Sequence, residues 1–260
     1  MKKHLAIIAA LVLVLPALAY PNIFSFKVGY FIPRAQSGPS FPDSLWTIEF
    51  DNMTFTKTNY QNTIIGLGYE YFLTRQLSLV LSLDTYNKNK SGFYRDYVGI
   101  DFTDGAFAFP NTFEGDFSIT HSFNVSITPL QLSLKLTPLG RRVRFIPYVG
   151  GGVGLYMWSV RLRGDTIDFS DPFIHTDLDG TETEVYPVVQ TYAQEPDSGV
   201  RFSVGYHVFG GFMFPLGQRI TLETEFKFNS CKGAFQDAFK DFEDFDLSGY
   251  QVTLGINYWF

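Results

Sequence analysis

The sequence predicts an all-β protein, a single eight-stranded antiparallel transmembrane β-barrel, and three observations lead to that prediction. Apolar residues alternate with polar or small residues in eight segments, each close to the roughly 9 to 11 residues that a tilted transmembrane strand needs. The connections between these segments alternate between short and long. The chain begins with an export signal, and no later segment stays apolar long enough to span a membrane as a helix.

Residues 1–19 have the three parts of a cleaved signal peptide. Lys2 and Lys3 precede an apolar run, and small residues end at Ala19, after which we expect cleavage. Residues 20–260 then form one barrel domain. Cleavage removes two of the 20 basic residues and none of the 26 acidic ones, which leaves a formal charge of −8 and argues against nucleic-acid binding. The single Cys231 excludes a disulfide framework.

Each predicted strand has one apolar face, which we expect to meet lipid, and one polar or small-residue face, which we expect to line the lumen. In the fourth strand the alternation changes phase. Phe123, Val125 and Ile127 are assigned outward before Pro129, and Leu130 is assigned outward after it. We interpret the change as a β-bulge at the proline. The predicted strands are 24–32, 65–71, 77–84, 123–136, 145–160, 201–208, 220–228 and 250–260.

The connections predict which end of the barrel faces outward. Short turns fall near 73–76, 138–143 and 216–219, whereas the long segments are 34–60, 87–120, 163–199 and 231–248. Outer-membrane barrels have short periplasmic turns and long external loops. Ten strands remain an alternative if 45–54 or 94–108 pairs as an extra hairpin.

The last residues, Thr253-Leu254-Gly255-Ile256-Asn257-Tyr258-Trp259-Phe260, and the glycine-rich stretch 147–154 resemble the OmpA/OmpX/OmpW-like family of small outer-membrane β-barrel proteins. The resemblance implies an outer-membrane location with lipid as a partner. It also implies that the barrel-insertion machinery reads Thr253, Gly255, Tyr258 and Phe260 as an assembly signal.

Eight charged residues are predicted to point into the lumen, four of each sign. Side chains nearly fill the lumen of an eight-stranded barrel, and a charge buried there must be paired or solvated. We therefore predict a salt-bridged plug, with a narrow polar conduit as the alternative. The eight residues are Lys27, Glu70, Asp84, Lys135, Arg201, Glu223, Glu225 and Lys227.

Catalysis is the less favoured interpretation of the histidines. His207 shares a face with Ser203, and Glu223 or Glu225 follows on the next strand, which are the residue types of a hydrolase triad. An inward site would not meet lipid, however, and the motifs of known lipid-modifying barrels are missing. We predict a lumenal hydrogen-bonded histidine, no enzymatic activity, no cofactor and no assigned metal site.

Two external segments have distinctive compositions. The segment from Asp165 to Asp197 is acidic, which favours a solvated loop, with a divalent cation bridging to lipid phosphates as the alternative. The last long segment places Phe235, Phe239, Phe242 and Phe245 at helical intervals. We interpret these rings as an aromatic girdle and extended strand ends, with a lid over the barrel mouth as the alternative.

These observations predict an integral outer-membrane barrel with a structural role in the envelope and loop-mediated binding. The alternatives are an OmpW-like conduit for apolar or small polar solutes and, third, an outer-membrane hydrolase.

Overall fold

A computed structural model describes residues 22–100, 106–109, 116–140, 143–195 and 200–260. The predicted signal peptide lies outside the described residues. No helix in these ranges is long and apolar enough to cross a membrane.

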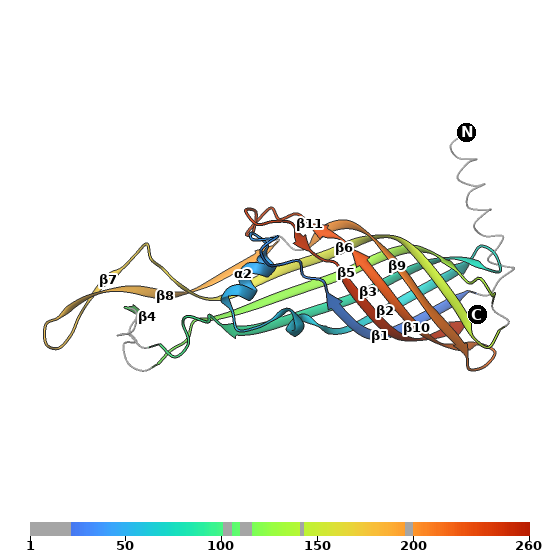
Figure 1. Ribbon diagram of the computed structural model, residues 1–260, viewed down its shortest axis with the longest axis horizontal. Helices are drawn as coiled ribbons and strands as arrows, with labels where there is room; N and C mark the ends of the chain where they lie inside the picture. Colours follow the sequence, from blue (N-terminus) through green and yellow to red (C-terminus); the bar gives the residue numbers. More distant parts are fainter. Residues whose placement is uncertain (1–21, 101–105, 110–115, 141–142, 196–199) are drawn as a thin grey trace, which may run out of the picture.

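Eight antiparallel strands form a closed barrel, as the sequence predicts. Each strand pairs with its neighbour along the barrel wall, and the first strand pairs with the last, which closes the sheet (Figure 1). The strands are β1 (Ile23–Pro33), β2 (Asn62–Phe72), β3 (Leu77–Phe93), β5 (Thr120–Leu136), β6 (Ile146–Ile167), β9 (Arg201–Pro215), β10 (Ile220–Ser230) and β13 (Gly249–Trp259).

The ten-strand alternative is wrong. Most of residues 45–54 form the helix α2 (Leu45–Asn52). The described part of 94–108 contributes one short strand, β4 (Phe107–Ala108), which pairs with β8 (Glu182–Glu195) outside the barrel wall.

An apolar band surrounds the barrel on its outer surface. Alternate side chains of every barrel strand point outward there and are exposed, because a β-strand sends successive side chains to opposite faces. Exposed leucine, valine and aromatic side chains cost free energy in water, so the band is the lipid-facing surface of a transmembrane barrel. Its exposed members include Phe24, Phe26, Val28, Tyr30, Ile65, Leu67, Leu81, Leu83, Leu130, Leu132, Leu134, Val149, Val153, Leu155, Tyr206, Val208, Leu222, Phe226, Val252, Leu254 and Ile256.

The fourth barrel strand, β5, corrects the predicted bulge. Its pairing with β3 and with β6 keeps one register from Phe123 to Leu136, so Pro129 inserts no extra residue. Phe123, Val125 and Ile127 are buried inside the barrel, and the outward-facing apolar residues of β5 begin at Leu130. The alternation has one phase throughout. The polarity of the two faces changes along the strand.

This change of polarity marks the end of the apolar band. Leu83 and Leu130 form a paired, outward-facing row. Beyond that row the outward residues are Thr85, Asn87, Asn89 and Ser91 on β3 and Thr128, Ser126, Asn124 and Ser122 on β5. Outward polar groups favour water or lipid headgroups, so the part of the barrel beyond the row of Leu83 and Leu130 extends out of the hydrocarbon layer. Its interior can then be apolar.

The end of the barrel that carries the long segments, here called the loop end, has additional structure. A 3-10 helix, η2 (Lys57–Tyr60), follows α2, and two short strands, β11 (Lys232–Gly233) and β12 (Phe245–Asp246), pair with each other. The outer part of β6 pairs with β8, and β8 also pairs with β7 (Phe173–Thr176). These strands form an arm that extends beyond the barrel (Figure 1). The acidic segment, expected as a loop, is therefore largely a hairpin.

Candidate functional site

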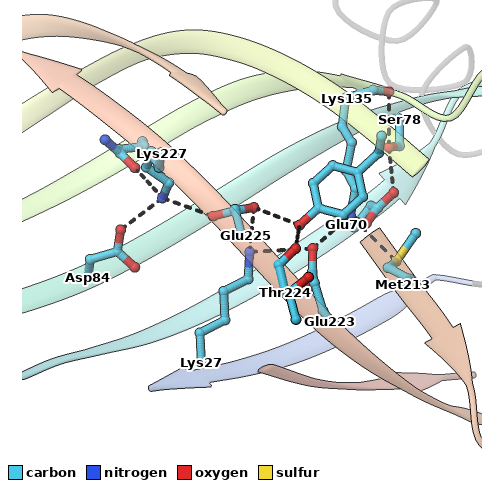
Figure 2. Close-up of polar contacts among 12 residues, drawn as sticks. Lys27, Glu70, Ser78, Asp84, Lys135, Met213, Glu223, Thr224, Glu225 and Lys227 are labelled. Atoms are coloured by element: carbon cyan, nitrogen blue, oxygen red, sulfur yellow. Dashed lines mark hydrogen bonds and ion pairs between the residues drawn. The ribbon is translucent and has the colours of Figure 1, made fainter. Parts of the chain in front are cut away.

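The lumen holds a continuous chain of ion pairs, here called the charge network. Seven of the eight predicted inward charges belong to it: Lys27 on β1, Glu70 on β2, Asp84 on β3, Lys135 on β5 and Glu223, Glu225 and Lys227 on β10. Figure 2 shows their side chains meeting in the lumen from several walls. The alternation of five strands sends these residues to the same interior space, although their sequence positions span 200 residues.

Three lysines connect four carboxylates in the charge network. Lys135 Nζ lies 3.0 Å from Glu70 and 3.3 Å from Glu223. Lys27 Nζ lies 3.7 Å from Glu223 and 2.8 Å from Glu225. Lys227 Nζ lies 3.7 Å from Glu225 and 2.9 Å from Asp84. Each lysine therefore bridges two acids, which offsets part of the desolvation cost of burying these charges.

Neutral groups supply further contacts. The Tyr148 hydroxyl donates a hydrogen bond to Glu225 at 3.2 Å, and its ring lies 4.0 Å from Lys135 Nζ. Ser78 donates to Glu70 at 2.5 Å. The contacts share the excess negative charge among neutral donors, and they fix the rotamers of the long side chains.

Arg201, the eighth predicted residue, lies apart from the charge network. Its guanidinium contacts Glu195 at 2.6 Å and Asp237 at 2.7 Å. Arg201 is the first residue of β9, at the loop end, so its side chain meets the external segments instead of the lumen. The alternation of β9 gave the correct face but could not show that the residue stands beyond the lumenal charges.

A neutral layer lies beyond the charge network toward the loop end. Gln131 donates a hydrogen bond to Asn229 at 2.7 Å and accepts one from Lys227 at 3.0 Å. Tyr156 donates to Asn229 at 3.1 Å. This layer joins the charges to the aromatic residues above them.

The histidine geometry does not fit the hydrolase alternative. His207 is buried, and its Nε2 lies 2.7 Å from the hydroxyl of Ser133, not Ser203. Ser203 accepts a hydrogen bond from Trp158 Nε1. Within the described residues, His207 Nδ1 has no hydrogen-bond partner, whereas a triad requires a carboxylate there. His121 Nε2 contacts the backbone oxygen of Asp165 at 3.0 Å.

Two external segments fill the barrel mouth with aromatic side chains. We call residues 45–60 and 231–248 the lid. Trp46 stacks on Phe245 with ring centroids 4.9 Å apart and contacts Phe123 of β5 at 5.4 Å. Trp46 Nε1 also donates to the backbone oxygen of Asp246, which joins the two halves of the lid. The other buried members of this cluster include Phe31, Leu45, Phe50, Met53, Phe55, Tyr60, Tyr86, Val125, Ile127, Tyr156, Trp158, Phe235, Phe239 and Leu247.

The lid corrects the girdle interpretation of the last long segment. Phe235, Phe239 and Phe245 are buried in the cluster, and Phe242 packs against it half-buried. The segment forms β11, β12 and turns, without the helix that the spacing of the phenylalanines suggested. Sequence reasoning missed Trp46 and Tyr60 altogether. The available signal was the apolar face of the strands near the loop end, such as Phe123 and Val125 of β5. An apolar face that points inward requires apolar partners inside the barrel mouth.

The cavities described in the lumen are small. The cavity beside the charge network has a volume of about 20 Å³, and one beneath the lid, lined by Phe31 and Tyr86 among others, has about 10 Å³. Each cavity has room for about one water molecule.

Glu49 of α2 is buried in the lid, and it forms no ion pair with any residue that the structure describes. Its side chain is 3% exposed, and its Oε2 has no hydrogen-bond partner among the described residues. Burial raises the pKa of Glu49 to about 7. Tyr60 and Tyr94 lie near enough for the Glu49 carboxylate to raise the pKa of each hydroxyl further.

The acidic residues of the arm do not form a metal centre in the part of the chain that the structure describes. Asp177 lies 3.2 Å from His175 Nε2, and Asp179 accepts a hydrogen bond from the backbone nitrogen of Thr181. The carboxylates instead stabilise the turn of a hairpin.

The four residues of the expected assembly signal lie on β13 or directly after it. Thr253 and Gly255 point inward and are buried, whereas Tyr258 and Phe260 are exposed on the outer surface with ring centroids 6.4 Å apart.

Solved structures of small barrels are similar to this chain along most of its length. Neisserial surface protein A is 10% identical, with 92% of this chain and 97% of that chain covered and a TM-score of 0.46. Ail of Yersinia pestis is 9% identical, with coverage of 92% and 99% and a TM-score of 0.42. The N-terminal β-barrel domain of Pseudomonas aeruginosa OprF is 12% identical, with 92% of this chain and 97% of that chain covered and a TM-score of 0.36. No family model and no curated protein matches the chain.

The fold assignment rests on the chain's own geometry. The pairing of β1 with β13 closes the sheet, and the outward residues form an apolar band. The chain is an eight-stranded antiparallel transmembrane β-barrel, the architecture of the small outer-membrane barrels that its sequence resembles.

Proposed function

We propose that the chain is exported, loses residues 1–19, and serves in the outer membrane as a sealed, non-enzymatic barrel. Its role is structural, with the segments at the loop end presented for binding. Lipid contacts the apolar band. The barrel-insertion machinery recognises the last strand through Thr253, Gly255, Tyr258 and Phe260.

The observation that supports a sealed barrel is the filled lumen. The charge network fills one part of the lumen and the lid fills the mouth; in the described residues, the cavity beside the network holds about 20 Å³ and the one beneath the lid about 10 Å³. A solute conduit needs a continuous hydrated path, and opening one here would break ion pairs whose partners are buried. The conduit alternative is therefore disfavoured.

The absence of enzymatic chemistry is supported by the surroundings of the histidines. A catalytic base must reach its substrate, and His207 is buried beside Ser133 beneath the lid. Glu223 and Glu225, the acids considered for a triad, are ion-paired with lysines.

Single-channel conductance of the refolded mature chain in a planar bilayer tests the proposal. We expect a silent barrel for the unchanged chain. Discrete openings that change in size or ion selectivity in Glu225→Ala or Lys135→Ala would contradict the sealed barrel and establish the conduit, with the charge network as its filter.

A further inference from the structure

The tip of the arm presents one face of a β-hairpin to solvent. We call residues 173–185 the outer hairpin. Ile174 pairs with Glu184 and Thr176 pairs with Glu182, so these four side chains share one face, and all are exposed or nearly so. Leu178, at the turn, protrudes fully from the surface. A solvated loop does not require exposed aliphatic side chains, which makes this face a candidate contact surface.

The opposite face of the outer hairpin is partly covered, with Phe173, His175 and Thr183 half-buried. Val185 is fully buried, and so is Ala108 on the neighbouring β4. On the barrel side of the outer hairpin, the ring centroid of Phe169 lies 6.2 Å from that of Phe107 and 5.3 Å from that of Tyr186. A partner would therefore pay little conformational entropy for ordering this surface.

Hydrogen bonds define the turn of the outer hairpin. The backbone nitrogen of Asp177 donates to the oxygen of Thr181 at 2.8 Å, and Gly180 donates to Asp177 at 2.9 Å. Gly180 has a φ of 87°, a conformation that other residues rarely adopt. Leu178 is consequently fixed in its exposed position.

From Asp165 to Glu195 the arm is acidic. Residues 165–195 contain eight acidic residues and no lysine or arginine. Hydrogen bonds from Ser170 lower the pKa of Asp168, and those from Thr181 lower the pKa of Asp179, so both carboxylates stay ionised in mild acid. The negative potential extends over the exposed aliphatic residues.

The base of the arm has the opposite charge. Arg161 and Arg163 are exposed on β6 and face outward beyond the apolar residue Leu155. They lie nearer to the apolar band than the outer hairpin does, because β6 pairs with the barrel strand β9 up to Trp158 and with β8 from Val160 onward. An anionic lipid surface would attract the base and repel the tip, which leaves the outer hairpin facing the solvent.

We propose that the exposed face of the outer hairpin docks a cationic, amphipathic polypeptide segment. Glu182 and Glu184 meet its basic side chains, and Ile174 and Leu178 meet its apolar ones. The partner's positive charge complements the outer hairpin, whose residues 173–185 include four acidic residues and no lysine or arginine. This inference rests on the proposed function and names the partner class for one of its external segments.

Peptide binding to the mature chain in phosphatidylcholine nanodiscs tests the proposal, with empty nanodiscs as the baseline. The probes are a labelled peptide of Lys and Leu, one with Ser replacing every Leu, and one with Glu replacing every Lys. We expect only the Lys–Leu peptide to bind, more weakly as salt rises. Glu182→Gln with Glu184→Gln should weaken it about tenfold, since each exposed ion pair contributes up to about 1 kcal/mol. Ile174→Ser should also weaken it.

The matched control removes two charges elsewhere. Asp241→Asn with Asp244→Asn changes two exposed acids of the lid segment and should leave the affinity within about twofold. Equal weakening in this control, or equal binding of the Lys–Ser peptide, overturns the proposal in favour of unspecific charge attraction. If the chain binds calcium and does not bind the Lys–Leu peptide, the proposal is overturned in favour of a cation site. A chain that is silent in the bilayer but binds no peptide leaves the sealed barrel intact and refutes only the docking surface.

Discussion

Lys227 on β10 contacts Asp84 on β3 at 2.9 Å, although 143 residues separate them in the sequence. In the order of the barrel strands, β3 and β10 lie on opposite walls. This ion pair therefore crosses the lumen, and it ends the chain of charges that starts at Glu70.

Replacing Lys227 by Met should destabilise the barrel by about 3 to 5 kcal/mol, because Asp84 and Glu225 would keep buried charges without their shared partner. Urea unfolding in vesicles measures the change. The double variant Lys227→Met with Asp84→Leu should recover part of the loss. The control Lys57→Met, on the exposed surface of η2, should leave the unfolding free energy within about 0.5 kcal/mol. A loss equal to that of the control would show that the lumenal pair contributes nothing.

Glu49 should make the lid less stable in alkaline solution. Its pKa is raised to about 7 in the folded chain, so the neutral form fits the lid and no penalty exists below the unfolded-state pKa of 4.5. Above that value the penalty grows, reaching about 3 kcal/mol once the pH exceeds the folded-state pKa. Hydrogen exchange of residues 45–52 should therefore be faster, relative to the intrinsic rates, at pH 8.5 than at pH 5.5.

Glu49→Gln should remove this pH dependence while leaving the lid closed at both pH values. Glu182→Gln, an exposed acid on the arm, should leave the dependence of the unchanged chain in place. The same pH dependence in Glu49→Gln would assign the titration to another group.

The two layers of the lumen should seal the barrel independently. Trp46→Ala removes the ring that joins both halves of the lid, and deleting a buried aromatic side chain costs about 3 to 5 kcal/mol. Protease sensitivity of residues 45–60 should rise, yet the planar bilayer should stay silent because the charge network is intact. Conductance from Trp46→Ala alone would mean that the charge network does not block ions.

The strand order, the closed barrel and the inward charges were predictable because they depend on alternation, which is a local property of the sequence. The lid was not. Its contacts, such as those of Trp46 with Phe123 and Phe245, join segments that no local pattern relates. The error at Pro129 has a physical cause as well. Each apolar residue was assumed to face lipid. Between the apolar band and the loop end, however, Phe123 and Ile127 face an apolar interior.

Phe260 should matter for assembly more than for stability. Its ring is exposed on the outer surface near Tyr258, so Phe260→Ala removes few internal contacts. If the insertion machinery reads the last strand, the variant should insert several-fold more slowly into membranes that contain the machinery. It should fold at an unchanged rate in detergent. Phe214→Ala, which removes another exposed ring from the turn end of β9, is the matched control and should insert normally. Equal slowing in both variants would assign the effect to lost lipid contact, since the two rings share that contact and only Phe260 belongs to the expected assembly signal.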